Sequence, residues 1–314
     1  MERVYQTEQF KWKLLNDNKG KDVQDVLGGF EDENKYGFFH RINTRYEKNL
    51  NLPSRTRAAE AILGDFKIIP GVGPVTASKF AERGIRDILD LTKDSRWCSK
   101  AEPICGIIEE GDLVKLQALV ERCHSLNHPN CYFLTGYARI EDLLFFDIET
   151  MGLSSKPLFL IGIGRFDEGA FVVDQFFARD TSEEKAVIQE FLNYLSESSV
   201  LVSFNGRSFD SRYIEERMVL HGLKGFNKLP HFDLLRMCRG KWSVPNYRLT
   251  TLERFILGEE REEDVPSSLV PHFYEIYMRK NNPGPVIPVI DHNKQDIVSM
   301  VSLLNHMARD ELDK

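Results

Sequence analysis

The chain of 314 residues is long enough for two domains, and its 42% hydrophobic and 28% charged residues are typical of globular proteins. A formal net charge of −7 does not by itself indicate a nucleic-acid-binding protein. The amino terminus has no apolar signal core, and the apolar stretch LFLIGIG at Leu158–Gly164 is far too short to cross a bilayer. We therefore expect a cytoplasmic protein without a membrane segment.

The charges are distributed unevenly along the chain. Residues 1–140 carry 21 Lys and Arg against 20 Asp and Glu, whereas residues 141–314 carry 20 against 28. Within the first part, residues 51–100 have 9 basic and 6 acidic side chains. This distribution favours a contact with a nucleic-acid backbone in the first part and a metal site in the acidic second part.

The five cysteines include no C-x-x-C pair, and their odd number argues against a framework of disulfides. Cys123, His124, His128 and Cys131 lie close enough in sequence to suggest a zinc site, although their spacing matches no standard pattern. The alternative is that the cysteines are ordinary buried or surface thiols.

Residues 1–54 form an amino-terminal arm whose role the sequence does not indicate. Phe10–Leu15 is predicted to be a short helix, and Gly28–Tyr46 is predicted to form a hairpin rich in aromatic residues. Pro53 and Ser54 mark the end of this arm.

Residues 55–130 are predicted to form a mainly helical domain. It contains the sequence IIPGVGP, in which two glycines permit a tight turn and Pro74 can begin a helix. The N–H groups at the start of that helix can bind a phosphate oxygen. The segment resembles a helix-hairpin-helix motif, and the alternative is a unit that only packs or contacts another protein. The resemblance implies sequence-independent binding of the DNA backbone by Gly71, Val72, Gly73, Thr76 and Lys79.

Residues 138–314 have the order of elements of an α/β domain. Three strands, a crossover helix and a fourth strand are expected at Leu143–Ile148, Leu158–Phe166, Ala170–Phe177, Glu183–Leu195 and Val200–Phe204. Further helices are expected at Ser208–His221, Thr250–Leu257, Pro271–Arg279 and Asp291–Arg309. This order resembles a ribonuclease-H-like domain, an α/β fold in which helices flank a mixed sheet.

Two carboxylates stand at the end of the first of these strands, in the sequence LLFFDIETMGL. Strand side chains alternate in direction, so Asp147 and Glu149 point to the same side. Their mutual repulsion is tolerable if a divalent cation neutralises it, and Mg²⁺ or Mn²⁺ prefers oxygen ligands. The alternative is a strand end with two acidic side chains in solvent.

Later segments supply further carboxylates. Asp210 closely follows the fourth strand, so it can face the same region as Asp147, although it could also be an ordinary first-turn carboxylate of the next helix. On the last helix, His292 and Asp296 are four residues apart and share one face. Taken alone, this pair could be a surface ion pair.

Together, D-x-E on the first strand, N-x-x-x-F-D after the fourth and H-x-x-x-D on the last helix resemble, in order, the three motifs of the DEDD superfamily of 3′–5′ exonucleases. The strings FFDIETMGL, VSFNGRSFD, RLTTLERFILG and HNKQDIVSM resemble its YprB-like, ribonuclease-H-like branch. The histidine departs from the better-known patterns, because relatives with a tyrosine use Y-x-x-x-D and those with a histidine use H-x-x-x-x-D. His292 therefore stands at the tyrosine spacing.

The resemblance implies hydrolysis of phosphodiester bonds with two divalent cations, Mg²⁺ or Mn²⁺. Asp147 would bridge both ions. Glu149 and Asp296 would hold the ion that activates water, and Asp210 would help to hold the other. His292 would take a proton from the attacking water. Residues just beyond the carboxylates would position the terminal nucleotide, namely Thr150, Met151, Asn205 and Phe209.

The expected function is thus a metal-dependent 3′–5′ exonuclease that acts on nucleic acid with a 3′ end, DNA rather than RNA. Nothing in the sequence reads a 2′-hydroxyl, so an exoribonuclease stays open. A non-catalytic nucleic-acid-binding or scaffolding module is a second alternative, although four intact carboxylates argue against it. A structure-specific endonuclease is a third, and would release oligonucleotides.

Overall fold

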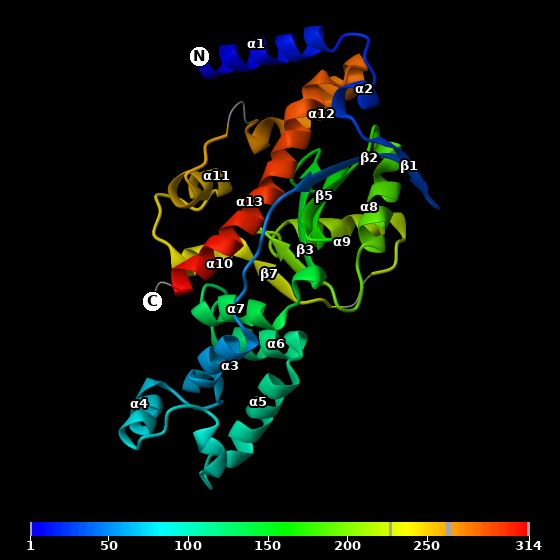
Figure 1. Ribbon diagram of the computed structural model, residues 1–314. Helices are drawn as coiled ribbons and strands as arrows, with labels where there is room; N and C mark the ends of the chain where they lie inside the picture. Colours follow the sequence, from blue (N-terminus) through cyan, green and yellow to red (C-terminus); the bar gives the residue numbers. More distant parts are fainter. Residues whose placement is uncertain (1, 226–227, 262–264, 313–314) are drawn as a thin grey trace.

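One mixed sheet of seven strands organises the molecule (Figure 1). The computed structural model describes residues 2–225, 228–261 and 265–312. The strand order is β1-β2-β5-β4-β3-β6-β7, in which β3, β6 and β7 are parallel and the other neighbours are antiparallel. The strands are β1 (Phe30–Asn34), β2 (Gly37–Tyr46), β3 (Leu143–Thr150), β4 (Leu158–Asp167), β5 (Ala170–Phe177), β6 (Val200–Ser203) and β7 (His231–Asp233).

Helices cover both faces of the sheet, which is why β3 and β4 are apolar along most of their length rather than alternating. The long helix α13 (Ile287–Leu312) packs on β3, β4 and β5, and α8 (Glu184–Asn193) packs on the opposite face. A glycine in β4 allows α13 to come close. A Cβ atom at Gly162 would lie 2.3 Å from Asn293 Oδ1 and 2.4 Å from the Ile297 side chain.

The other helices form two groups (Figure 1). Those beside the sheet are α1 (Glu2–Asp17), α2 (Val23–Leu27), α9 (Asp210–His221), α10 (Leu234–Lys241), α11 (Leu249–Leu252) and α12 (Val270–Lys280). Those in the lower part of Figure 1 are α3 (Arg55–Leu63), α4 (Pro74–Glu82), α5 (Cys98–Glu110), α6 (Leu113–Cys123) and α7 (Pro129–Phe133). We call this second group the helical region.

The helical region shares a hydrophobic core with the sheet. Ile62 of α3 and Leu116 of α6 belong to the same cluster of buried residues as Phe145 of β3 and Met300 of α13. Burial of apolar surface is the main favourable contribution to folding, so this continuity couples the stability of the two parts.

The amino-terminal arm contributes two strands to the sheet. The predicted hairpin over Gly28–Tyr46 is confirmed, since β1 and β2 pair in antiparallel register from Phe30–Arg41 to Asn34–Gly37. β2 then pairs with β5 along most of its length, from His40 to Tyr46. The arm therefore extends the sheet on the side of β5. The domain limits themselves, at 54, 130 and 138, stay predictions.

Most predicted elements are present with shifted ends. The expected helix Asp291–Arg309 begins about one turn earlier, at Ile287. The expected helix Thr250–Leu257 is a short α11 followed by a π-helical turn, Glu253–Leu257. The strand β7 is absent from the predicted elements, because three residues are too few to show a periodicity.

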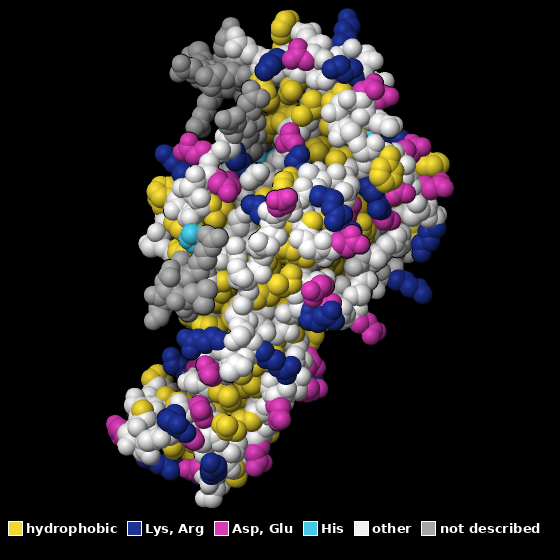
Figure 2. Space-filling view, in the orientation of Figure 1, with side chains coloured by type: hydrophobic (Ala, Val, Ile, Leu, Met, Phe, Trp, Pro, Cys, Tyr) yellow, Lys and Arg dark blue, Asp and Glu magenta, His cyan; other side chains and the backbone are white. Residues whose placement is uncertain are grey.

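The described part of the chain contains no helix both long and apolar enough to span a bilayer. All five cysteines are free thiols, in agreement with the prediction from their number. On the face shown in Figure 2, Lys and Arg side chains over the helical region alternate with Asp and Glu. On this face, the described part of the helical region therefore presents no broad basic surface.

Candidate active site

The carboxyl end of β3 carries the first two candidate ligands. Asp147 is half-buried and stands opposite Gly162 of β4, whose missing side chain admits α13. Glu149 and Thr150 are buried, and the register between β3 and β4 shifts between them. Such a shift bends the strand locally and redirects the side chains that follow.

Helix α13 holds Asp147 in place. Asn293 Nδ2 donates to Asp147 Oδ2 at 2.8 Å and to its backbone oxygen at 3.1 Å. Asn293 is fully buried, and its Oδ1 accepts a hydrogen bond from Gln175 of β5 at 2.8 Å. The same helix carries the predicted pair His292 and Asp296, whose Nε2 and Oδ2 atoms are 3.8 Å apart. The structure thus brings this pair to the strand that bears Asp147.

Asp210 reaches β3 from the first turn of α9. The chain between β6 and α9 turns sharply at Asn205, with φ of 67°, and at Gly206, where any side chain would collide with the end of β6. Asp210 is buried, and its charge contributes to the raised pKa of Asp147 on β3. Asp210 therefore lies near Asp147, and its role as a metal ligand stays a prediction.

Burial and neighbouring negative charges raise the pKa of these carboxylates. Burial, and then the charges of Asp296, Asp210 and Glu149, raise the pKa of Asp147 well above its usual range. Burial raises the pKa of Asp210 to about 7, and burial also raises the pKa of Asp296. Full ionisation of the cluster at neutral pH is therefore costly without a cation.

The donor set fits hard divalent cations. It consists of carboxylate oxygens from two strand positions and two helices, and Mg²⁺ and Mn²⁺ prefer such ligands. Within the described residues, no three of these carboxylates have ligand atoms that all lie within 4.8 Å of one another. The carboxylates would therefore have to draw together around an ion.

Arg261 brings a positive charge that no motif indicates. Its Nη2 donates to Asp296 Oδ1 at 2.6 Å, and its Nη1 lies 3.2 Å from His292 Nδ1. The buried carboxylate of Glu253 holds the same guanidinium through bonds of 2.7 Å to Nε and 2.6 Å to Nη2. No sequence spacing could reveal these contacts, because the chain between Arg261 and α13 passes through α12.

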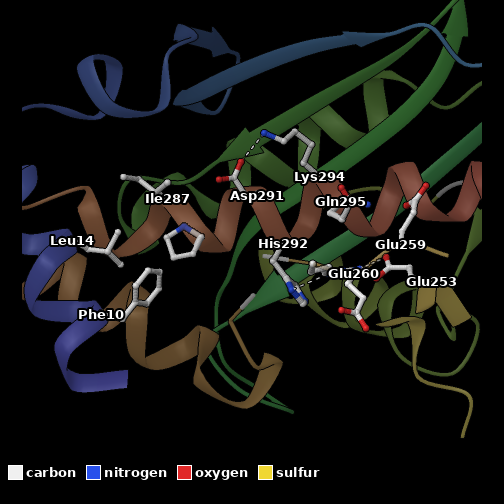
Figure 3. A pocket seen from close by; sticks show the side chains of 12 residues that line it. Phe10, Leu14, Glu253, Glu259, Glu260, Ile287, Asp291, His292, Lys294 and Gln295 are labelled. Carbon is white, nitrogen blue, oxygen red and sulfur yellow. Dashed lines mark hydrogen bonds and ion pairs between the residues drawn. The ribbon is translucent and has the colours of Figure 1, made fainter. Parts of the chain in front are cut away.

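A cavity of about 590 Å³ opens beside His292 (Figure 3). Phe10 and Leu14 of α1 line one side, and Glu253 and Arg261 line another together with the first turns of α13. His292 and Arg261 are therefore accessible from this cavity.

Asp233 is a further acidic residue near the site that the sequence motifs do not include. It lies at the end of β7, and its Oδ1 accepts the backbone N–H of Asn205 at 3.0 Å. Its Oδ2 is buried without a hydrogen-bond partner among the described residues. Burial raises the pKa of Asp233, and its charge contributes to the raised pKa of Asp210.

The residues predicted to touch the terminal nucleotide lie next to the carboxylates in the chain. The Thr150 hydroxyl donates to a backbone oxygen of the following turn, and Met151 is partly buried against the core. The ring of Phe209 lies 5.4 Å from that of Tyr213, centroid to centroid, and Asn205 forms the turn before α9. Their contact with a nucleotide stays a prediction.

The predicted phosphate-binding turn precedes α4. Gly71 has φ of 87°, a value that favours glycine, and Gly73 is the residue just before the helix. Both glycines are exposed, whereas the Val72 side chain is buried and can offer only its backbone. Thr76 is half-buried and Lys79 is exposed on the same helix. Binding of DNA by these residues stays a prediction.

The suggested Cys–His zinc site is not assembled. His124 Nε2 lies 2.6 Å and His128 Nε2 lies 4.0 Å from Asp65 Oδ2, and the two imidazole rings stack at 3.7 Å. The thiols of Cys123 and Cys131 donate instead to backbone oxygens. His128 Nδ1 accepts a backbone N–H at the start of α7, so a neutral His128 carries its proton on Nε2, toward Asp65. The side chains that lie together here are thus Asp65, His124 and His128, without the two thiols.

Residues 144–308 match a family model described as the RNase H superfamily. This match covers more than half of the chain and includes all the carboxylates of the candidate site. The chain belongs to the ribonuclease H superfamily. Membership of this superfamily confirms the predicted fold class, a mixed sheet flanked by helices.

Individual relatives match only part of their own length. Protein YprB of Bacillus subtilis (strain 168) is 33% identical over 181 residues, which are 55% of this chain and 43% of YprB. A DNA polymerase of Desulfurococcus sp. (strain Tok) is 27% identical over 154 residues, which are 38% of this chain and 20% of the polymerase. The chain spans less than half the length of these curated relatives.

Two solved structures are similar over about half of this chain. The family B DNA polymerase of Pyrobaculum calidifontis has a TM-score of 0.42 at 18% identity, covering 54% of this chain and 24% of that one. Exonuclease I of E. coli, solved in complex with a dT13 oligonucleotide, has a TM-score of 0.32 at 16% identity, covering 48% and 42%.

Proposed function

We propose that the protein is a metal-dependent 3′–5′ exonuclease of the DEDD type that hydrolyses DNA. One observation carries the proposal: acidic side chains of β3, α9 and α13 lie close enough together that the charges of Asp296, Asp210 and Glu149 add to burial in raising the pKa of Asp147. Such crowding of acidic groups is costly without a cation, and perturbed carboxylates of this kind are typical of functional sites. Similarity to curated DNA polymerases over 38% of this chain supports DNA as the substrate.

The carboxylates have distinct places in this proposal. Asp147 and Glu149 of β3, Asp210 of α9 and Asp296 of α13 would hold two Mg²⁺ or Mn²⁺ ions. When bound, such ions activate water and stabilise the charge that develops on the attacking and leaving oxygens. Asn293 keeps the Asp147 carboxylate directed into the site by its bond to Oδ2.

The neighbouring residues would bind and orient the substrate. Thr150, Met151, Asn205 and Phe209 would contact the terminal nucleotide. The turn at Gly71 and Gly73 and the first turns of α4, with Thr76 and Lys79, would bind phosphates farther along the strand without regard to sequence. In this arrangement the helical region binds the DNA backbone, and the carboxylates at the sheet carry out the hydrolysis.

The proposal is tested by release of labelled mononucleotides from 3′-labelled single-stranded and recessed DNA in Mn²⁺ or Mg²⁺. Wild type and the Asp291→Asn variant should release mononucleotides, and Asp147→Asn should not. Asp291 is a suitable control because it is exposed on the same helix, where its carboxylate pairs with Lys294. Equal inertness of wild type and Asp147→Asn on both DNA and RNA would overturn the enzymatic proposal in favour of a binding module.

The products of this assay also distinguish an exonuclease acting on DNA from an endonuclease and from an exoribonuclease. An endonuclease would release oligonucleotides rather than mononucleotides. An exoribonuclease would release mononucleotides from a matched RNA and spare the DNA. A chelator control on both substrates shows whether each reaction depends on a divalent cation.

A further inference from the structure

Arg261 is fixed in place before any substrate arrives. It follows the π-helical turn Glu253–Leu257, and only 10% of its side chain is exposed. Glu253, with 1% of its side chain exposed, accepts two hydrogen bonds from the guanidinium and one from the Ser299 hydroxyl of α13. A bidentate pair between Arg and a carboxylate defines the plane of the guanidinium as well as its position.

The remaining donors of Arg261 reach both members of the H-x-x-x-D motif. Nη2 donates to Asp296 Oδ1 at 2.6 Å, and Nη1 points to His292 Nδ1 at 3.2 Å. Figure 3 shows His292 and Glu253 directed toward the same part of the cavity wall. One guanidinium thus joins the buried Glu253 to two candidate site residues.

The contact with Arg261 favours one neutral tautomer of His292. A guanidinium has five N–H donors and no acceptor, so the imidazole nitrogen that faces it must offer a lone pair. Nδ1 is that nitrogen, and a neutral imidazole then carries its proton on Nε2. Nε2 faces the carboxylate site, 3.8 Å from Asp296 Oδ2.

We propose that Arg261, held by Glu253, is a positioning residue that fixes His292 as its Nε2–H tautomer, so that His292 donates a hydrogen bond to a phosphate oxygen of the substrate instead of accepting a proton from water. The same guanidinium occupies Oδ1 of Asp296 and leaves Oδ2 toward the site. The role toward phosphate rests on the proposed nuclease function, whereas the tautomer does not. His292 would then not be the proton acceptor that the motif resemblance implies.

The tautomer is measured on the metal-free, full-length protein by long-range ¹H–¹⁵N correlation spectra of histidine labelled with ¹⁵N, recorded at pH 8 in EDTA. His292 is assigned from the signals lost in His292→Gln. We expect an unprotonated Nδ1 and a protonated Nε2. A protonated Nδ1, whether in the other neutral tautomer or in an imidazolium, would overturn the proposal.

Removal of Arg261 alone would leave Glu253 as a buried unpaired charge, and such a variant can fail to fold. The test therefore uses the double variant Glu253→Gln/Arg261→Gln, in which two neutral amides replace the ion pair. We expect the tautomers of His292 to become mixed in this variant and to stay unchanged in Arg254→Gln. Arg254 is a matched control because it lies in the same segment, is 66% exposed and pairs with Glu260. An unchanged tautomer in the folded double variant would show that Arg261 does not determine it.

Substitutions of His292 separate a donor from a base. Gln can donate through its amide but cannot accept a proton from water, whereas Phe can do neither. If His292 donates, His292→Gln should keep mononucleotide release within about tenfold of wild type, and His292→Phe should lose on the order of a hundredfold or more. Equal losses in both variants would contradict the donor role. An inert wild type would overturn the nuclease function and the donor role with it, while the spectra still decide the tautomer.

Discussion

Asn293 links the candidate ligand Asp147 to the interior of the sheet. Its amide lies between Gln175 on one side and the Asp147 carboxylate on the other, with bonds of 2.8 Å to each. A carboxylate held in this way keeps one orientation without a cation, which lowers the entropic cost of binding one. Substitution of Asn293 therefore tests the site as directly as substitution of Asp147 does.

We predict that Asn293→Leu lowers the free energy of unfolding by about 1–3 kcal/mol, because the buried Gln175 amide and the Asp147 carboxylate each lose a hydrogen bond. Mononucleotide release should fall as well, since Asp147 loses its fixed direction. Chemical denaturation and the nuclease assay measure the two effects. Gln189→Leu on α8 is a control, because among the described residues its amide bonds to Asn193 alone, near the helix surface. If Asn293→Leu behaves like this control, Asn293 does not support the site.

The raised pKa of Asp210 predicts a pH dependence of stability. Its pKa is about 7 in the folded protein and about 3.9 in an unfolded chain, so the folded state binds more protons between these values. Stability should therefore fall as the pH rises from about 4 through 7, and this fall reflects the cost of burying a charge. In EDTA, the melting temperature of wild type should be lower at pH 8 than at pH 5.

The variant Asp210→Asn isolates this contribution, because an amide of the same shape has no charge to bury. Its melting temperature in EDTA should change less between pH 5 and pH 8 than that of wild type. Addition of Mn²⁺ at pH 8 should raise the melting temperature of wild type more than that of the variant. Identical pH profiles for the two proteins would contradict the crowded carboxylate cluster.

Motif spacing indicated the candidate carboxylates of the site, but it did not indicate the residues that contact and support them. Asp147 and Glu149 are visible as D-x-E because strand periodicity places them on one side. Asn293, Arg261 and Asp233 act through contacts between segments far apart in the chain, and no local pattern records such contacts. An asparagine inside an apolar helical stripe is nevertheless a signal, because a buried amide requires partners.

At the scale of elements, the packing of α13 against β4 assembles the site. The helix can approach because Gly162 presents no side chain to Asn293 and Ile297. This closeness places Asn293 within hydrogen-bond distance of Asp147, which pairs with Gly162 across the two strands. The sequence predicted both β4 and α13. It did not indicate that Gly162 is needed for their close packing, because that depends on a contact between distant segments.

The turn before α4 is the element proposed to bind DNA. Gly73 has open space around its Cα and an extended backbone, with φ of −101°, so a side chain can be added there without strain. Gly71 is unsuitable for the same test because its φ of 87° disfavours other residues.

We predict that Gly73→Val weakens DNA binding severalfold, because its side chain blocks the approach of a phosphate to the N–H groups of α4. Fluorescence anisotropy with labelled single-stranded and duplex DNA measures the affinity. The melting temperature should stay within about 2 °C of wild type, as expected for an exposed substitution. Gly106→Ala on α5 is the control, because its Cα also faces open space. Unchanged affinity would leave the turn with a packing role.

At the scale of the whole molecule, one continuous hydrophobic core connects the helical region to the sheet. Residues of α3, α6, β3 and α13 belong to the same buried cluster. The arm before residue 54 is also part of this arrangement, since β2 pairs with β5. Composition and charge predicted two functions in two parts of the chain, but could not show that the parts are packed together, because burial depends on contacts between distant segments.

We predict that the molecule unfolds in one cooperative transition. Trp97 lies buried in the helical region, and Trp242 packs against the core near α13. Two variants that retain a single tryptophan each, obtained by Trp→Phe at the other two positions, report on the two parts separately. Their fluorescence should give the same midpoint in urea, apart from the effect of the substitutions, and should coincide with circular dichroism for each variant. A separate, earlier transition at Trp97 would mean that the helical region is an independent domain.

The most direct test of the nuclease account is the product pattern from 5′-labelled single-stranded DNA and a matched RNA in Mn²⁺, with and without EDTA. We predict that wild type shortens the DNA from its 3′ end in single-nucleotide steps, that EDTA stops the reaction, and that Asp147→Asn leaves the DNA intact. A single internal cut, or intact DNA and RNA with wild type and variant alike, would contradict the account.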